Sequence, residues 1–435
     1  MRPKLTPLIL AAALHAWPAD PNVVLIISDD HGWPDYGFMG NAQVRTPHID
    51  RLAREGLTLT RGYVPSSLCR PSLASIMTGL YPHQHRITGN DPPGEARNAN
   101  SRASMVRVFQ ESKTLAGLLT ARGYMSLQTG KWWEGECKCG GFTECMTHGD
   151  VARGGRHGDQ GLDIGRKTMQ PVFSFIDRAA SGKKPFFLWY APMMPHTPHN
   201  PPDRLLSKYT GLDFGIAKYY AMIEWFDETI GQLMDHLSKA GVADNTLVVY
   251  MADNGWVQVP GGVVPSRAKL SPYDAGLRTP LIFWHPKRIR PARDSDALAS
   301  TVDVAATVLP FAGLKPLAGM PGINVLDAKA RSRREAVFGA IFAHSSADIE
   351  KPEANVKYRW VVRGRHKLVI PHTANASLAL WPGSGSVPWM RGQTELFDIL
   401  ADPGEQSDLS ASQPALAKEL AALVNRWWPV AENRQ

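Results

Sequence analysis

Apolar runs of strand length alternate with amphipathic helical stretches along most of this 435-residue chain, from residue 22 to about residue 315. The run Val23 to Ile27 is apolar and rich in β-branched residues, and the run Leu247 to Met251 has the same character. Strands of this kind are covered on both faces by other elements. Two weaker strands and a helix continue the alternation, at Phe186 to Tyr190, Leu281 to Trp284 and Tyr219 to Leu237. The pattern predicts an α/β fold with a large, mostly parallel sheet sandwiched by helices.

The pattern changes after about residue 335. Short strands are expected at Tyr358 to Val362 and at Lys367 to Ile370, followed by a helix over Pro414 to Trp427. We therefore expect a catalytic domain over residues 20–334 and a smaller, antiparallel C-terminal domain over residues 335–435.

The first residues have the features of a Sec-type signal peptide. Basic Arg2 and Lys4 precede the apolar stretch Leu5 to Ala16, and small residues follow, so we expect residues 1–19 to be removed. A buried N-terminal helix is the alternative. The apolar stretch is shorter than the roughly 20 residues that span a bilayer, so no stable membrane insertion is expected. The predicted location is periplasmic or secreted.

The chain has a formal net charge of +8, which favours encounters with anionic substrates. Its basic residues are scattered and do not form runs, so a solvated surface accounts for them and no nucleic-acid partner is expected.

Three of the four cysteines, Cys137, Cys139 and Cys145, lie within nine residues. A disulfide is expected there in an oxidising compartment. Free thiols, or a zinc site completed by His148, are the alternatives.

Oxygen-bearing side chains follow two of the predicted strands. Asp29 and Asp30 come directly after the first strand, and Asp253 and Asn254 follow Leu247 to Met251. Ligands of open α/β sheets bind at the carboxyl ends of strands. Adjacent acids there repel one another unless a cation neutralises them, and carboxylates with an amide carbonyl suit a hard divalent ion, Ca²⁺ before Mg²⁺. A helix cap or a turn is the alternative for either pair alone.

Cys69 is expected at the start of a helix, because Pro71 suits a first helical turn and Gly79 suits a helix end. Free N–H groups at a helix N-terminus favour a reactive group or a bound oxyanion. A buried structural cysteine is the alternative.

These residues form a recognisable series. The sequence Cys69-x-Pro71-Ser72, followed by Thr78-Gly79, resembles the signature of the formylglycine sulfatases in the alkaline-phosphatase-like superfamily. Further blocks that resemble the family occur in the expected order: Asp29-Asp30-His31-Gly32, Thr46-Pro47-His48-Ile49-Asp50, Gly130-Lys131-Trp132, Pro195-His196-Thr197-Pro198, Asp253-Asn254-Gly255, Lys269 to Pro280, and Glu395-Leu396-Phe397-Asp398 with Asp402-Pro403-Gly404-Glu405.

The resemblance implies a sulfuric ester hydrolase that acts on a sulfated small molecule or glycan. A maturation enzyme oxidises the family's signature cysteine, here Cys69, to Cα-formylglycine, whose hydrate is the nucleophile. His196 is implied as the acid that protonates the leaving alcohol, either alone or shared with Lys269. The remaining implied roles are one Ca²⁺ on Asp29, Asp30, Asp253 and Asn254, and contact with the sulfate by Lys131 and Lys269.

Two positions depart from the family pattern. Leu73 stands where the family usually has an arginine, and Trp133 stands where a histidine is typical. Leucine cannot replace a guanidinium. Either Arg70 or another basic group substitutes, or the modification is inefficient, or the protein is inactive.

Two rivals share the fold. One is a formylglycine hydrolase of phosphate diesters or phosphonate monoesters, and the other is a catalytically silent protein that binds sulfated glycans. The stretch Trp133 to Arg166 is a candidate pocket wall, with an ordinary surface loop as its alternative, and His157 and His199 are candidate pocket residues.

Overall fold

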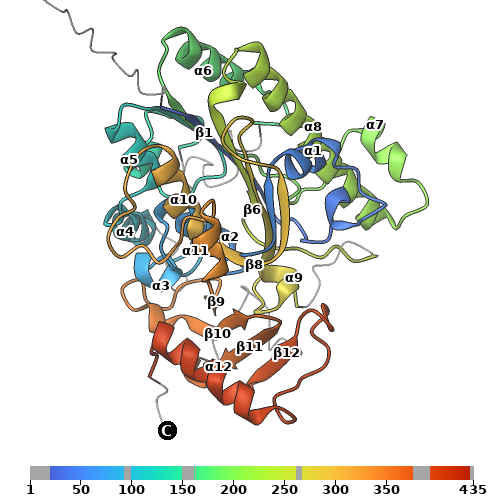
Figure 1. Ribbon diagram of the computed structural model, residues 1–435, viewed down its shortest axis with the longest axis vertical. Coiled ribbons are helices and arrows are strands. Elements are labelled where there is room, and N and C mark those ends of the chain that lie inside the picture. Colours follow the sequence, from blue (N-terminus) through green and yellow to red (C-terminus); the bar gives the residue numbers. More distant parts are fainter. Residues whose placement is uncertain are drawn as a thin grey trace, which may run out of the picture.

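The computed structural model describes residues 20–92, 99–148, 161, 163–260, 267–375 and 392–431 (Figure 1). The predicted signal peptide at residues 1–19 and His157 lie outside the described residues, as does part of the predicted pocket wall.

The large sheet has eight strands in the order β4-β3-β5-β1-β6-β7-β2-β8. Neighbouring strands pair in parallel except at β7, which runs antiparallel to both β6 and β2. The prediction of a mostly parallel sheet is therefore confirmed. The strands are β1 (Asn22–Ser28), β2 (Leu57–Tyr63), β3 (Met125–Gly130), β4 (Glu144–Cys145), β5 (Phe186–Ala191), β6 (Thr246–Ala252), β7 (Arg278–Trp284) and β8 (Ala292–Ser300).

Strand β1 lies inside the sheet, between β5 and β6, and alternate side chains enter two different cores. Val23 and Leu25 belong to the core on one face, and Val24 and Ile26 belong to the core on the other. Each apolar side chain buried in this way stabilises the fold by about 1.5–3 kcal/mol. A strand that is apolar on both faces is therefore held firmly, and so is the backbone that leaves its end.

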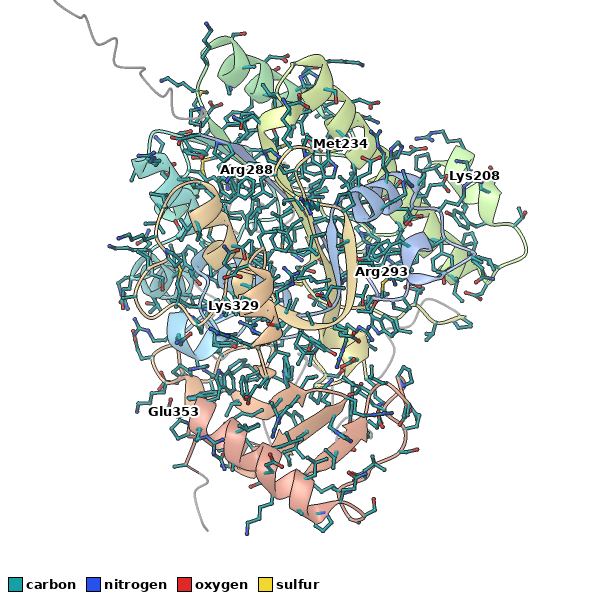
Figure 2. The ribbon with its side chains drawn as sticks, viewed as in Figure 1. Lys208, Met234, Arg288, Arg293, Lys329 and Glu353 are labelled. Atoms are coloured by element: carbon teal, nitrogen blue, oxygen red, sulfur yellow. A yellow bond between two sulfur atoms is a disulfide. The ribbon has the colours of Figure 1, made fainter. Side chains whose placement is uncertain are left out.

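Helices cover both faces of the sheet, and their side chains fill the space against it (Figures 1 and 2). One face is covered by α2 (Cys69–Thr78), α4 (Ala99–Gln110), α5 (Leu115–Ala121) and α10 (Asp303–Phe311). The other is covered by α1 (Pro47–Glu55), α6 (Gln170–Ser181) and α8 (Phe214–Lys239). Shorter helices connect these elements: α3 (Pro82–His85), α7 (Asp203–Leu206), α9 (Asp274–Leu277) and α11 (Ala328–Ser332).

A second sheet follows in the C-terminal part of the chain, drawn in orange and red in Figure 1. It is antiparallel, in the order β12-β11-β10-β9, as the pattern predicts. Helix α12 (Pro414–Trp427) covers one face, where Leu420 and Val424 pack with Val361 and Leu368. The domain boundary near residue 335 stays a prediction. The strands are β9 (Ala336–Phe342), β10 (Val356–Arg363), β11 (His366–Pro371) and β12 (Glu395–Asp398).

The other face of the small sheet packs against the large one. Trp360 of β10 shares a core with Tyr63 of β2 and with Tyr273. The backbone N–H of Ala340 donates to Pro65 O at 2.9 Å. The small sheet therefore fixes the segment that leads from β2 to Cys69.

Among the described residues, no helix combines the length and the apolar character that crossing a bilayer requires.

Candidate active site

The ends of β1 and β6 bring two acidic segments together. These strands are parallel neighbours, with Ser28 opposite Ala252, so the residues that follow them meet at one edge of the sheet. The backbone N–H of Asp30 donates to Asp253 Oδ1 at 3.2 Å. Asp30 has a φ of 58°, in the left-handed region, which turns the chain sharply after Asp29. The structure therefore places the acids of the two strand ends side by side, as the sequence predicts.

Two buried lysines lie among these acids. Lys131, directly after β3, places its Nζ 2.6 Å from Asp29 Oδ1 and 3.2 Å from Asp253 Oδ2. Lys269 Nζ lies 2.7 Å and 2.9 Å from the two oxygens of Asp30. Three carboxylates thus face two ammonium groups, which leaves one negative charge when all five are ionised. A bound divalent cation would convert that into one positive charge, which suits the single negative charge of a sulfate ester.

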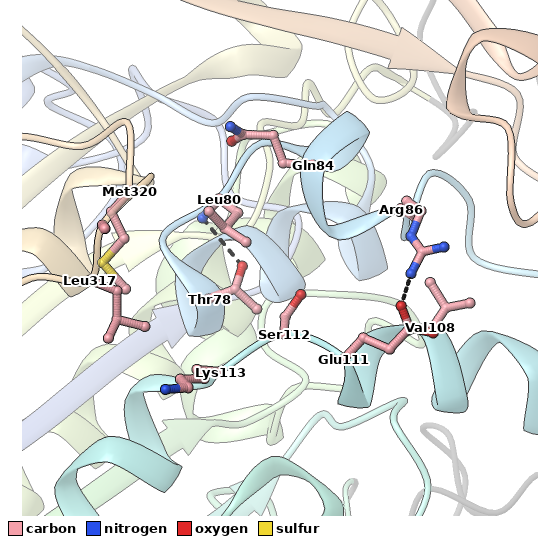
Figure 3. Close-up of a pocket in the computed structure, with 11 residues that line it drawn as sticks. Thr78, Leu80, Gln84, Arg86, Val108, Glu111, Ser112, Lys113, Leu317 and Met320 are labelled. Carbon is pink, nitrogen blue, oxygen red and sulfur yellow. Dashed lines mark hydrogen bonds and ion pairs between the residues drawn. The ribbon is translucent and has the colours of Figure 1, made fainter.

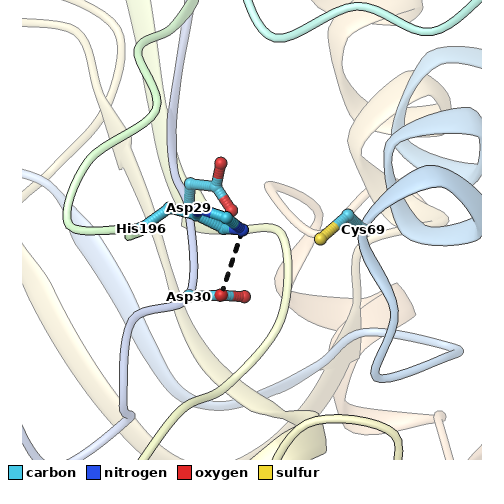
Figure 4. A group of neighbouring side chains, drawn as sticks. All are labelled: Asp29, Asp30, Cys69 and His196. Atoms are coloured by element: carbon cyan, nitrogen blue, oxygen red, sulfur yellow. Dashed lines mark ion pairs between the residues drawn. The ribbon is translucent and has the colours of Figure 1, made fainter. Parts of the chain in front are cut away.

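Cys69 and His196 complete the cluster, which is shown in Figure 4. Cys69 is the first residue of α2, and its thiol faces the acids. One ligand atom from each of Asp29, Asp30, Cys69 and His196 lies within 4.8 Å of the other three. The structure therefore brings together residues from three distant parts of the sequence in a group that could hold a metal ion.

The thiol of Cys69 is not activated as it stands. Burial raises the pKa of Cys69 to about 12, although Lys131 and Lys269 act in the opposite direction. The thiol is therefore protonated at neutral pH, and only a thiolate is an effective nucleophile. This environment disfavours a cysteine hydrolase that uses the unmodified side chain.

Burial and the neighbouring charges shift the pKa values of the three acids. Burial raises the pKa of Asp253 to about 7, with Asp29 adding to the effect. Burial also raises the pKa of Asp29, against the lowering effect of Lys131. For Asp30 the burial effect is outweighed, and its neighbouring positive groups hold the pKa below the usual range. Burial is the larger cause and the neighbouring acids add to it, so a divalent cation bound here would favour the ionised carboxylates.

Within the described part of the chain, two buried oxygen atoms of this site lack a hydrogen-bond partner, Asp29 Oδ2 and Asn254 Oδ1. The amide nitrogen of Asn254 donates to Asp30 Oδ1 at 2.7 Å. Buried polar atoms without partners are uncommon and call for an explanation such as an ion. Carboxylate and amide oxygens are the donors that Ca²⁺ takes, so these residues fit the predicted ion. The individual ligand roles, including that of Asp253, stay predictions.

His196 lies in the loop after β5, next to Asp30. Its Nδ1 lies 2.7 Å from the backbone oxygen of Thr197, and its Nε2 lies 3.5 Å from Asp30 Oδ2. Burial lowers the pKa of His196 to about 4, while Asp30 acts to raise it. The candidate pocket residue His199 stacks obliquely on Tyr219, with ring centroids 5.5 Å apart. A role for His199 in a pocket stays a prediction.

The two departures from the family pattern occupy one place. Leu73 and Trp133 line the same small void of about 10 Å³, next to Arg70 and Glu134. Arg70 is buried and forms a forked pair with Glu134, at 2.8 Å from Nε to Oε1 and 2.6 Å from Nη2 to Oε2. The pair is neutral as a unit, so Arg70 does not supply the positive charge that the family arginine brings to this position. Trp133 lies with its ring 6.0 Å from the ammonium of Lys131.

The cysteine cluster forms a disulfide between Cys137 and Cys145, and Cys139 is free. The predicted disulfide is therefore confirmed. The bond uses two of the three thiols that a zinc site would need.

A separate hollow of about 320 Å³ lies near the end of α2, lined by Thr78, Arg86, Glu111 and Met320 among others (Figure 3). Arg86 is ion-paired with Glu111 there. Thr78 lies nine residues beyond Cys69, about 13 Å along the helix, so this hollow is not part of the Cys69 cluster.

Two residues of the candidate pocket wall, Glu134 and Arg166, shape this region, although sequence reasoning gave neither of them a role of its own. Glu134 pairs with Arg70, 64 residues earlier in the chain. Arg166 binds the loop that carries His196. Neither lies in a motif, and each acts through a contact that depends on how a distant loop folds.

A mostly parallel α/β sheet that gathers acids, lysines and a helix-terminal cysteine at its strand ends defines a protein of the alkaline-phosphatase-like class. Residues 21–314 match the family model described as Sulfatase, which is more than half of the chain. The chain belongs to the Sulfatase family, and the resemblance seen in the motifs is confirmed.

Individual relatives agree with this assignment. An N-acetylgalactosamine-6-sulfatase of Canis lupus familiaris is 29% identical over 350 residues, covering 71% of this chain and 65% of that protein. The chain thus spans slightly less than two thirds of the length of that relative.

Two solved structures share the fold. The crystal structure of Ps i-CgsB in complex with k-i-k-neocarrahexaose has a TM-score of 0.75 at 24% identity, and covers 95% of this chain and 94% of that one. The phosphonate monoester hydrolase of Agrobacterium radiobacter has a TM-score of 0.68 at 18% identity, and covers 93% and 95%. At these identities the likenesses show the fold alone.

Proposed function

We propose that this chain hydrolyses a sulfate ester, with a formylglycine made from Cys69 as nucleophile and one Ca²⁺ held by Asp29, Asp30, Asp253 and Asn254. The observation that carries the proposal is the cluster in which Cys69, Asp29, Asp30 and His196 present ligand atoms within 4.8 Å of one another. The family assignment supports the reaction class.

Two groups would complete the site: a hydrated formylglycine at residue 69 would supply the nucleophilic hydroxyl and a second hydroxyl for the release of sulfate, and Ca²⁺ held by the acidic residues would supply Lewis-acid polarisation of a sulfate oxygen. The side chains do the rest. Lys131 and Lys269 supply positive charge where negative charge accumulates on the transferred group. His196 gives a proton to the ester oxygen as its bond to sulfur breaks, and the anionic substrate favours the protonated ring. In the net reaction, water and the ester yield an alcohol and sulfate.

We propose a sulfated carbohydrate as the substrate. The support comes from the names of the relatives, an N-acetylgalactosamine-6-sulfatase among the sequences and a complex with k-i-k-neocarrahexaose among the structures. Specificity depends on loops around the shared centre, so the particular sugar and linkage are left to a substrate screen.

The test begins with mass spectrometry of the peptide that contains residue 69, purified from a host that has the maturation enzyme. We expect the mass of the aldehyde in place of that of the thiol. Turnover of a panel of aryl and sugar sulfates should then depend on this modification. Cys69→Ala should abolish turnover, whereas Cys139→Ala, which removes a free cysteine outside the cluster, should leave it intact.

Two outcomes would contradict the proposal. A strong preference for phosphate diesters or phosphonate esters over aryl sulfates would make the chain a phosphorus-ester hydrolase of the same fold. Binding of sulfated sugars without turnover, by protein that carries formylglycine, would make it a silent binding protein.

We further propose that the chain is exported as a periplasmic or secreted protein. The disulfide between Cys137 and Cys145 supports this, because such bonds persist mainly in oxidising compartments. Cell fractionation with N-terminal sequencing of the mature protein tests it, and an intact residue 1–19 segment on cytoplasmic protein would contradict it.

A further inference from the structure

The loop that carries His196 is bound by one arginine from a distant part of the chain. Arg166 Nη2 donates to the backbone oxygens of Met193 at 2.6 Å and His196 at 3.0 Å. Its Nη1 donates to Pro198 O at 3.1 Å and to the side-chain oxygen of Asn200. A single guanidinium thus meets four acceptors within eight consecutive residues.

A tight turn presents this arginine. Within it, the N–H of Gly165 donates to Thr168 O at 3.0 Å, and the N–H of Lys167 donates to Asp163 O at 2.8 Å. Gly165 has a φ of +75°, and a Cβ there would lie 2.7 Å from the terminal methyl of Met194. The turn therefore packs directly against the loop that Arg166 binds.

The same loop is attached to the acidic cluster at its other side. The N–H of Asp29 donates to Met194 O at 3.0 Å. The loop is thus fixed both to the end of β1 and to Arg166, and His196 lies between these attachments. Because Nδ1 of His196 contacts the backbone of its own loop, the direction of Nε2 depends on the loop conformation.

We propose that Arg166 is a positioning residue that holds His196 where it can protonate the leaving alcohol, an inference that rests on the proposed function. Water can satisfy carbonyl groups of a partly exposed loop, so stability alone does not need an arginine here. The planar guanidinium of Arg166 holds several acceptors of the loop in a fixed arrangement at once, and a lysine ammonium cannot do this. Displacing a catalytic group by about 1 Å can cost on the order of 100-fold in rate.

The test compares two esters of similar shape, phenyl sulfate and 4-nitrophenyl sulfate. Phenol is a poor leaving group that needs the acid, whereas 4-nitrophenol leaves without one. For Arg166→Met we expect kcat on phenyl sulfate to fall roughly 10- to 100-fold and kcat on 4-nitrophenyl sulfate to change less than about 3-fold, with KM nearly constant. Arg166→Lys should recover little of the loss. His196→Ala should give the same pattern, and the double variant should be no worse than His196→Ala alone.

Lys167→Met is the matched control, since 74% of the side chain of this neighbour is exposed and it forms an ion pair with Asp163. It should behave as the wild type. If Arg166→Met lost the same activity on both esters, or lost none on either, the proposed role of Arg166 would be overturned, and the proposed sulfatase function would still stand.

A second readout does not need turnover. In ¹⁵N-histidine NMR spectra, the ring signals of His196 should move in Arg166→Met and stay in place in Lys167→Met. Unmoved signals in Arg166→Met would also overturn the inference, whereas a wild type inactive on every sulfate ester would contradict the proposed function instead.

Discussion

At the residue scale, the candidate site divides into contacts that follow from strand ends and contacts that depend on loops. The sequence predicts that Asp29 and Asp253 lie side by side because both directly follow buried strands of one parallel sheet. It could not predict that Arg70 pairs with Glu134, since that contact depends on how the chain after Lys131 folds against α2. Motif comparison identified the missing family arginine but could not show what fills its place.

Calcium should stabilise the protein through Asp29. At a concentration about 100 times its dissociation constant, a ligand that binds only the folded state adds about 2.7 kcal/mol. We expect EDTA to lower the thermal midpoint of the wild type and added Ca²⁺ to raise it. Asp29→Asn should lose most of this shift, because it removes a buried carboxylate whose Oδ2 lacks a partner. Differential scanning fluorimetry in EDTA and in Ca²⁺ measures the effect.

The matched control is Asp244→Asn, whose side chain is 66% exposed and pairs with Lys287 at the surface. This variant should keep the full calcium response. If Asp29→Asn responded to Ca²⁺ as strongly as the control, the ion would have to bind elsewhere.

Leu73 should behave as a packing residue. It is 7% exposed and belongs to the core beneath α2, beside a void of only about 10 Å³. Leu73→Ala should lower the free energy of unfolding by about 2–5 kcal/mol, and Leu73→Met by less than about 1.5 kcal/mol. Leu73→Arg should be the most harmful, because the void has no room for a guanidinium. Urea unfolding measures all three, with Leu400→Ala, at a 51% exposed position, as the neutral control. Equal stability of Leu73→Ala and the wild type would contradict this packing role.

At the scale of elements, the strands that the sequence predicts most clearly are apolar on both buried faces, whereas β2 is also buried throughout but carries Thr58, Thr60 and Arg61 and gives no apolar signal. Val23 to Ile27 and Leu247 to Met251 lie inside β1 and β6, as expected. The sequence gives no such signal for β8, because this edge strand is largely exposed over its first six residues. The antiparallel direction of β7 also had no signal, since a short apolar run carries no information about strand direction.

A buried ionic network joins the small sheet to the segment that carries Lys269. Lys367 of β11 lies 2.8 Å from Asp274 Oδ1 and 2.9 Å from Glu405 Oε1, and it is completely buried. Glu405 Oε2 accepts the N–H of Asp274 at 2.6 Å. Lys367→Met would leave two buried acids without their cation and should cost about 3–5 kcal/mol. Arg51→Met, which breaks an exposed pair with Glu55, should cost less than about 1 kcal/mol.

The cost of Lys367→Met should depend on pH. Burial already raises the pKa of Glu405 to about 7, and Lys367 is the strongest influence that lowers it. Without Lys367 that pKa rises further, so the folded state holds a proton that the unfolded state releases as the pH rises above the ordinary pKa of 4.5. The folded wild type already holds this proton up to about pH 7, so the variant should lose stability relative to the wild type above about pH 7, until the pH passes its own higher pKa. Urea unfolding across this range measures it, and a constant difference would contradict the assigned network.

At the scale of the whole molecule, the two sheets build the site together. The small sheet contacts the segment before Cys69 through Ala340, and its buried network reaches the segment after Lys269 through Glu405. The net charge of +8 surrounds a cluster that itself is one charge negative without a cation. The overall charge therefore favours the approach of anions, and a divalent cation bound at the cluster would make their binding there favourable.

The number of cysteines that can be alkylated tests both the export of the chain and the modification of Cys69. The chain has four cysteines, of which Cys137 and Cys145 are bonded and Cys139 is free. If Cys69 becomes formylglycine, exported protein that is unfolded and alkylated without reductant should take up label only at Cys139. Protein made in a reducing cytoplasm without the maturation enzyme should be labelled at all four positions, and intact-mass spectrometry counts the labels. Cys139→Ser removes the expected label from the exported form. A label at residue 69 in active, exported enzyme would refute the modified nucleophile, because formylglycine has no thiol to alkylate. Labels at Cys137 and Cys145 would refute an oxidising location, because a disulfide protects both thiols from the reagent.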